Sequence, residues 1–200
     1  NPNSAVLLNG EKRTGISFVL IDEGFDTGDI LAQKEVKILP TETAGELHQR
    51  LYRETEKIIA YIIDSWAGSK LDNNYNRYND YSNYIQLFLP PKKQNNYTAT
   101  YTKKLQREDG FVEWKKLLKA NSELFHLWRA LSPWPGMWTE VQLSNVSKSV
   151  TSVKKRLKIL KARLEKEEFV IDEVQLEGKK PVAWEQFKKA YKVYAPLTLV

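Results

Sequence analysis

Residues 16–29 decide the fold of the first part of the chain, and they read Ile16-Ser17-Phe18-Val19-Leu20-Ile21-Asp22-Glu23-Gly24-Phe25-Asp26-Thr27-Gly28-Asp29. The first half of this stretch is rich in β-branched and aromatic residues in alternation, which predicts a strand buried on at least one face. The second half contains two glycines among acidic residues, a composition that favours a turn. Residues 30–38 then favour a second extended segment.

A long helix is expected after this second segment. Thr43 and Glu46 have the spacing of a capping box, which marks a helix start. Apolar residues continue at helical spacing at Leu47, Leu51, Ile58, Ile59, Ile62 and Trp66. A strand, a turn, a strand and a helix indicate one side of an α/β sandwich, and the other strands of a parallel sheet are expected before Asn1.

The composition changes over residues 68–96, which are dense in Asn and Tyr and contain Pro90-Pro91. We expect three parts: residues 1–69, an interdomain linker at 70–96, and a second domain at 97–200. Tyrosines recur every third residue at Tyr75, Tyr78, Tyr81 and Tyr84. They either form a base-stacking surface for RNA or pack on a neighbouring domain, and packing is the simpler explanation.

The second domain is expected to be a small β structure with helices at each end. A helix should follow Trp114, with Leu117, Leu124, Leu127, Trp128 and Leu131 as its apolar face and Pro133 as its end. Strands are expected at 138–143, 156–164 and 168–176, and a closing helix at 184–191. Residues 154–164 fit either a helix or a bulged strand. Both leave a basic face, which is either a phosphate contact or a solvated surface.

Composition and charge restrict the class of protein. With 42% hydrophobic and 28% charged residues, the chain is expected to be globular, and the absence of cysteine excludes disulfides and thiolate chemistry. No apolar run approaches the roughly 20 residues that cross a bilayer, so we expect a cytoplasmic protein without membrane contact. Residues 1–100 have 11 basic against 13 acidic side chains, and residues 101–200 have 20 against 12. The second half is therefore expected to attract a polyanion.

The acidic turn is the best candidate for chemistry. The two histidines, His48 and His126, fall inside amphipathic helices without metal-ligand neighbours, so no metal site is expected. Ligands of α/β proteins bind at loops that end buried strands, and Asp26 lies in such a loop, where partial desolvation is expected. From the residues alone, this Asp is equally suited to capping or holding a turn.

The turn and its flanks resemble the folate-dependent formyltransferases. The matching segments are Thr14-Gly15-Ile16, Asp22-Glu23-Gly24 and Asp26-Thr27-Gly28-Asp29-Ile30, in the family's order and spacing. Downstream, residues 97–105, 109–114, 129–139 and 178–184 resemble the C-terminal domain of methionyl-tRNA formyltransferases. The implied fold is α/β, the C-terminal part of a Rossmann-like formyltransferase domain followed by a small OB-like β-barrel.

The resemblance implies transfer of a formyl group from 10-formyltetrahydrofolate to the amino group of methionyl initiator tRNA in translation initiation. Asp26 would be the catalytic residue that orients and charges a histidine. The backbone of the segment Asp22, Glu23, Gly24, Phe25 and Asp26 would border the pteridine ring. The family's Asn and His would precede residue 1, so this chain alone is expected to be inactive and the full-length protein monomeric.

The basic half of the chain would contact the tRNA backbone, with the candidates Lys103, Lys104, Lys154, Lys155, Arg156 and Lys158. Two alternatives stay open. One is a sugar-nucleotide or other folate-dependent formyltransferase, and the other is a non-catalytic RNA-binding OB module. The net charge of the second half favours RNA over a small acceptor.

Overall fold

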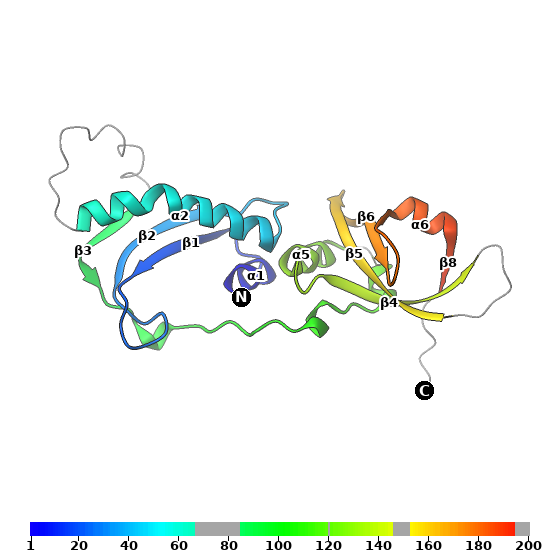
Figure 1. Cartoon of the computed structure of the whole chain (residues 1–200), viewed down its shortest axis with the longest axis horizontal. Helices are drawn as coiled ribbons and strands as arrows, with labels where there is room; N and C mark the ends of the chain where they lie inside the picture. The colour runs from blue at the N-terminus through cyan, green and yellow to red at the C-terminus, as the bar shows by residue number, and fades with distance from the viewer. Residues whose placement is uncertain (67–84, 120, 146–152, 195–200) are drawn as a thin grey trace. The chain divides into compact units, whose positions relative to one another are not determined.

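The computed structural model of the chain describes residues 1–66, 85–119, 121–145 and 153–194 (Figure 1). The chain divides into two compact units. Unit 1 consists of Asn1–Gly10, Thr41–Gly45 and Lys103–Val200, and unit 2 consists of Glu11–Pro40 and Glu46–Thr102. The tyrosine repeat at 75–84 lies outside the described residues.

Unit 2 is built on a three-stranded antiparallel sheet. Its strands β1 (Arg13–Val19), β2 (Ile30–Lys37) and β3 (Gln86–Lys92) have the order β1-β2-β3. Helix α2 (Ala44–Trp66) runs along one face of this sheet (Figure 1), where Ala32 of β2 packs with Ile58 and Ile62 of α2. The α/β character of this part is therefore confirmed, and every strand pair in the described residues of unit 2 is antiparallel.

The first strand shows the two-residue period expected of a sheet with one buried face. Thr14, Ile16 and Phe18 are half-buried, and they alternate with exposed residues in β1. The strand covers residues 13–19 in place of the expected 16–22, so Leu20 to Asp22 belong to the turn. In α2, Leu47, Ile58 and Ile62 are buried as expected, whereas Ile59 is 43% exposed.

Strand β3 lies inside the range that the composition marked as a linker. It pairs with β2 at the edge of the sheet, and it contains both Pro90 and Pro91. Proline lacks the backbone donor of a central strand but is tolerated at an edge, where one row of donors has no partner strand. A 3₁₀ turn, η2 (Asn96–Thr98), follows β3.

Unit 1 contains a five-stranded sheet in which each strand is antiparallel to its neighbours. Its order is β7-β6-β5-β4-β8, formed by β4 (Met137–Asn145), β5 (Val153–Glu165), β6 (Glu168–Leu176), β7 (Val182–Ala183) and β8 (Tyr191–Tyr194). Closing a barrel would require its two edge strands to pair, and β7 and β8 do not pair in the described residues. The expected OB-like barrel is therefore not confirmed.

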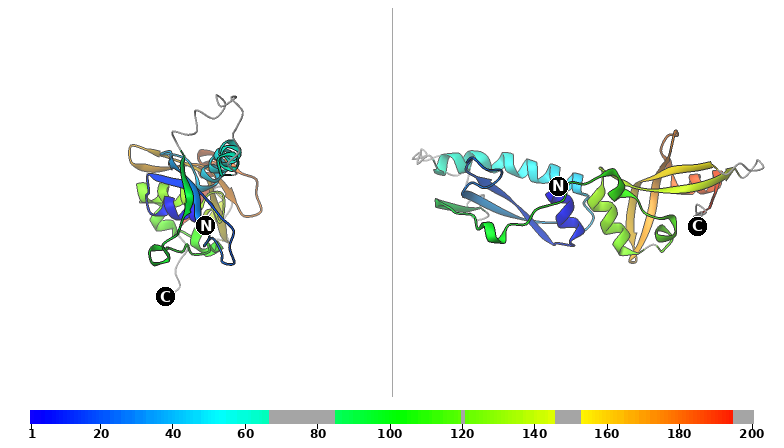
Figure 2. Two further views of the ribbon diagram at one scale, coloured as in Figure 1. Left: turned by 90° about the vertical axis from the view of Figure 1, so that its left-hand side faces the viewer. Right: turned by 90° about the horizontal axis from the view of Figure 1, so that it is seen from below.

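The ambiguous basic segment is a bulged strand. Strands β5 and β6 run side by side as a hairpin (Figure 2), and their register shifts between Ile159 and Ala162. Leu157 and Ile159 are buried before the shift, and Ala162 and Leu164 pack against the core after it. The bulge explains why the apolar residues fit neither a simple strand nor a helix perfectly.

Helices surround the core of unit 1. The expected helix after Trp114 is two helices, α4 (Trp114–Leu117) and α5 (Ser122–Leu131), because the side chain of Asn121 caps α5 by accepting a hydrogen bond from Leu124 N at 3.2 Å. α5 packs against α1 (Pro2–Leu8) and ends before Pro133. Helix α6 (Trp184–Ala190) and the 3₁₀ turn η3 (Arg107–Gly110) complete the unit.

The core of unit 1 joins α5, α6 and the sheet. Phe125 of α5 and Phe187 of α6 are 2% and 1% exposed, and they share one apolar cluster with Leu157 of β5 and Val174 of β6. In the described part of the chain, no helix is both long enough and apolar enough to span a membrane.

Candidate active-site turn

The acidic turn between β1 and β2 is closed by its own hydrogen bonds. At its base, Leu20 N donates to Asp29 O at 2.9 Å. Inside the turn, Asp22 Oδ1 accepts from Gly24 N at 3.0 Å and from Thr27 Oγ1 at 2.7 Å. A short carboxylate that binds the backbone two residues later is a common way to stabilise a turn. Asp22 is therefore a structural residue of the turn.

Both glycines of the turn lie where a side chain would collide. A Cβ added at Gly28 would lie 1.7 Å from Leu20 O, and one at Gly24 would lie 2.1 Å from Thr27 Oγ1. Asp26 between them has a φ of 58°, in the left-handed region that few residues other than glycine adopt. Asp and Asn adopt this region more readily than other residues with a side chain, so an Asp is well suited to this position.

The turn presents its side chains to solvent. Asp26 is exposed, which differs from the expected partial desolvation, and Phe25 and Ile21 are 95% and 100% exposed. A hollow of about 200 Å³ is lined by residues of the turn and the end of β1. Chemically, the turn combines a carboxylate that can accept protons or hydrogen bonds with apolar side chains that can cover a flat ring.

One residue that contacts the turn was not expected from the sequence. Gln94 lies between β3 and η2, and its Nε2 donates to Asp26 O at 2.9 Å and to Gly28 O at 2.6 Å. It falls inside the range 70–96 that was expected to be a linker. Sequence patterns indicate local structure, and they contain no signal for a contact between residues 68 positions apart.

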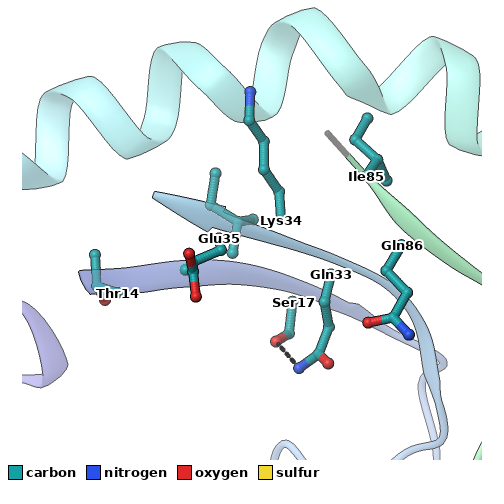
Figure 3. Close-up of a pocket in the computed structure, with 9 residues that line it drawn as sticks. Thr14, Ser17, Gln33, Lys34, Glu35, Ile85 and Gln86 are labelled. Atoms are coloured by element: carbon teal, nitrogen blue, oxygen red, sulfur yellow. Dashed lines mark hydrogen bonds between the residues drawn. The ribbon is translucent and has the colours of Figure 1, made fainter. Parts of the chain in front are cut away.

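A larger hollow of about 530 Å³ lies elsewhere in unit 2 (Figure 3). Residues of all three strands of the sheet line this hollow, among them Ser17, Gln33, Glu35 and Gln86. Gln33 Nε2 donates a hydrogen bond to Ser17 Oγ at 2.9 Å. None of its lining residues belongs to the turn. The larger hollow is therefore not taken as the functional site, and the turn is the better candidate because it contains the sequence motif.

The predicted basic residues are divided between two faces of the sheet of unit 1. Lys154, Arg156 and Lys158 alternate along β5, and they lie opposite Gln142, Glu140 and Trp138 of β4. Lys155 lies opposite Val141, whose side chain is fully buried, so Lys155 belongs to the other face. We call the face with Lys154, Arg156 and Lys158 the outer face.

The outer face combines cationic and aromatic groups. The guanidinium of Arg156 lies 4.7 Å from the centre of the Trp138 ring, and Lys154 Nζ lies 2.5 Å from a carboxylate oxygen of Glu140. Trp138 Nε1 donates to Arg107 O at 2.9 Å, which attaches η3 to this face. Just before η3, Lys103 and Lys104 are exposed, and Lys103 Nζ lies 3.7 Å from an Asp109 carboxylate oxygen.

The two histidines lie in separate units. His48 is exposed on α2, and His126 is half-buried on α5 next to the ring of Phe125. Within the described residues, no group of three or more His, Asp or Glu side chains has the arrangement of a metal site.

Comparison with known proteins identifies the family. The protein-family model described as "Formyl transferase" matches residues 1–63. The family model described as "Formyl transferase, C-terminal domain" matches residues 104–170. The chain belongs to the formyltransferase family. The first match contains the whole acidic turn, and the second contains α5 and most of the outer face.

Curated relatives agree with this assignment. Methionyl-tRNA formyltransferase of Halothermothrix orenii is 32% identical over 139 residues, which are 70% of this chain and 37% of the relative. The enzyme of the same name from Clostridium novyi is 28% identical over 199 residues, 93% of this chain and 58% of the relative. This chain thus spans between about one third and three fifths of the length of these relatives.

Solved structures support the fold. Methionyl-tRNA formyltransferase from Clostridium thermocellum superimposes with a TM-score of 0.50 and 19% identity, over 88% of this chain and 61% of that one. HypX from Aquifex aeolicus in complex with tetrahydrofolic acid has a TM-score of 0.59 and 12% identity, over 94% of this chain and 32% of that one. At these identities the likeness concerns the fold alone.

Proposed function

We propose that this chain is part of a methionyl-tRNA formyltransferase, which transfers a formyl group from 10-formyltetrahydrofolate to the amino group of methionyl initiator tRNA. One observation is central to the proposal: a family-typical Asp-Thr-Gly-Asp turn and a basic aromatic sheet face occur in one chain. The curated relatives named methionyl-tRNA formyltransferase support it. The activity is assigned to the protein as a whole, because the chain spans only part of its relatives.

The turn has features that suit a folate. Exposed Ile21 and Phe25 supply apolar surface beside the hollow, and the exposed backbone of residues 22–26 supplies hydrogen-bonding groups for a heterocycle. When bound, 10-formyltetrahydrofolate would supply the formyl carbon that the amine attacks. The segment from Asp22 to Asp26 would hold the ring system, since it is the part of the chain that the family resemblance assigns to the pteridine.

Asp26 would act through its carboxylate. An amine that attacks an acyl carbon must lose a proton, and the developing oxyanion needs a positive or hydrogen-bonding partner. A carboxylate that accepts a hydrogen bond from an imidazole keeps that imidazole oriented and favours its charged form. Asp26 is proposed to have this role toward the family's histidine, which neither His48 nor His126 matches in sequence context.

The outer face would bind the phosphate backbone of the tRNA. Lys154, Arg156 and Lys158 project from one face of one strand, so their charges act on the same side of the sheet. The guanidinium of Arg156 is held against Trp138, which limits its freedom before any ligand binds.

The turn is tested by formyl transfer. The assay uses charged initiator tRNA and 10-formyltetrahydrofolate with this chain and with the longest natural polypeptide that contains it. Asp26→Asn is expected to lower kcat of the active form by roughly 10²- to 10⁴-fold. Asp172→Asn is the matched control, because Asp172 lies in β6 and pairs with exposed Arg163. Full activity of Asp26→Asn, or formylation of an amino-sugar nucleotide in place of tRNA, would contradict the proposal.

The outer face is tested by the salt dependence of tRNA binding. Lys158→Gln is expected to reduce the slope of log affinity against log salt by roughly 0.7 to 0.9, the effect of losing one phosphate contact. Lys155→Gln removes the same charge from the opposite face and should leave the slope unchanged. Equal effects of the two variants would show that binding follows net charge and not the face.

A further inference from the structure

Gln94 connects the acidic turn to a part of unit 2 that is distant from it in sequence. Its Nε2 donates to two backbone carbonyls, Asp26 O at 2.9 Å and Gly28 O at 2.6 Å. Both acceptors belong to the segment that the family motif places at the active site. The contact comes from a residue that neither the turn nor its two strands contain.

The chemistry of the contact requires an amide nitrogen. Both partners are carbonyl oxygens, which only accept, so the nitrogen end of the side chain must face them. An NH₂ group has two hydrogens, and each can be directed to one of the two carbonyls. A glutamate of the same shape would place acceptors against acceptors, and a methionine of similar length would supply no donor.

The contact acts on the strained part of the turn. Asp26 has its φ at 58°, and Gly28 approaches Leu20 O too closely for any Cβ. The bonds of Asp22 hold the first half of the turn through Gly24 and Thr27. Gln94 holds the second half, from Asp26 to Gly28.

We propose that Gln94 is a positioning residue, which fixes the backbone on both sides of Thr27 so that the carboxylate of Asp26 is presented in one orientation. Its effect on catalysis rests on the proposed function, whereas its effect on the turn does not. Gln94 needs no contact with substrate for this role, because it acts through the backbone of Asp26.

Hydrogen exchange tests the effect on the turn. The variants are Gln94→Met and Gln94→Glu, and the matched control is Gln33→Met, which removes a glutamine side-chain hydrogen bond to Ser17 elsewhere in the same sheet. Exchange of the Leu20 and Gly24 amides, which are hydrogen-bonded in the turn, is expected to rise roughly tenfold or more in both Gln94 variants and to stay near wild type in the control.

A pH series separates a hydrogen-bonding role from simple packing. A protonated carboxyl can donate one hydrogen bond, so the excess exchange of Gln94→Glu should shrink as the pH falls from about 7 to about 4. The excess exchange of Gln94→Met should be the same at every pH, relative to wild type. Turn exchange in Gln94→Met that equals the Gln33→Met control would overturn the proposal, whatever the activity.

Kinetics on the active form of the protein test the effect on catalysis. Gln94→Met is expected to lower kcat roughly 10- to 100-fold with little change in KM for tRNA, because a misplaced carboxylate impairs the reaction more than tRNA binding. A loosened turn with unchanged kcat would overturn the catalytic part of the inference. A loosened turn in a protein whose wild type transfers no formyl group would refute the proposed function and leave the role in the turn intact.

Discussion

Arg129 and Glu42 form a buried charged contact in unit 1 that predicts a large loss of stability on substitution. Arg129 is 5% exposed and Glu42 is 6% exposed. Arg129 Nε donates to Glu42 O at 2.8 Å, and its guanidinium lies 5.7 Å from the centre of the Phe125 ring. The contact joins α5 to the segment Thr41–Gly45. This segment ends with the first residues of α2, which begins at Ala44.

Arg129→Met is expected to lower the free energy of unfolding of unit 1 by about 3 to 5 kcal/mol. Removing one partner of a buried charged pair costs about this much, because the attraction between the two charges, which offsets the cost of burying them, is lost. The substitution also leaves the carbonyl of Glu42 without this donor. Arg163→Met is the matched control, since the side chain of Arg163 is 53% exposed and its loss should cost less than about 1 kcal/mol.

The loss should not depend on pH in the ordinary range. Burial lowers the pKa of Arg129 from its usual value, and the negative charge of Glu42 opposes this shift. A lowered pKa means that the unfolded state holds the proton more tightly, so stability would rise only as the pH approaches the lowered pKa. Arginine stays charged between about pH 6 and pH 9, and the difference between wild type and Arg129→Met should be constant there.

The assay is urea unfolding followed by tryptophan fluorescence. Five of the six tryptophans lie in unit 1, and Trp128 is the neighbour of Arg129, so the signal reports mainly on this unit. A loss of about 3 kcal/mol would move the midpoint by roughly 1 to 3 M urea. A midpoint of Arg129→Met that equals that of Arg163→Met would show that the buried contact contributes nothing, and would refute the reasoning.

Two further predictions concern the turn and the cap of α5. Gly28→Ala should disrupt the turn and cost about 1 to 3 kcal/mol, because its Cβ would meet the backbone at Leu20 O. Gly24→Ala should cost about 1 kcal/mol, because its Cβ meets the side chain of Thr27, which can rotate away by giving up its hydrogen bond to Asp22. Unfolding of both variants checks this, and a greater loss at Gly24 would contradict it. Asn121→Ala should cost about 1 kcal/mol through loss of the cap on Leu124 N, and Asn121→Ser should restore most of it. The cap has no such role if alanine and serine give the same urea midpoint.

Local patterns predicted most elements of both units. The alternation of β1, the apolar spacing of α2 and the strand character of β6 all depend on residues near one another in sequence, and the structure confirms these elements. The prediction of one continuous helix after Trp114 was wrong, because Asn121 caps the start of a second helix. Asn favours a helix start over a helix interior, and this preference prevailed over the helical spacing of the apolar residues on either side of it.

Non-local pairing explains what the patterns missed. The prolines and Asn-rich composition around β3 favoured a linker, yet the open edge of β2 accepts this strand and tolerates its prolines. Likewise, the segment Lys154–Leu164 was equally compatible with a helix until its pairing with β4 and β6 selected the bulged strand.

The sequence by itself determined the acidic turn, because its two glycines, its short acidic side chains and its place after a strand are properties of consecutive residues. Only the tertiary structure decided which residues act on that turn and which lysines share a face. Gln94 reaches Asp26 across 68 positions, and Lys155 is separated from Lys154 and Arg156 by the pleat of a strand that the sequence left undecided. Such contacts depend on how distant segments pack, and that packing is set by the burial of the whole chain rather than by any local pattern.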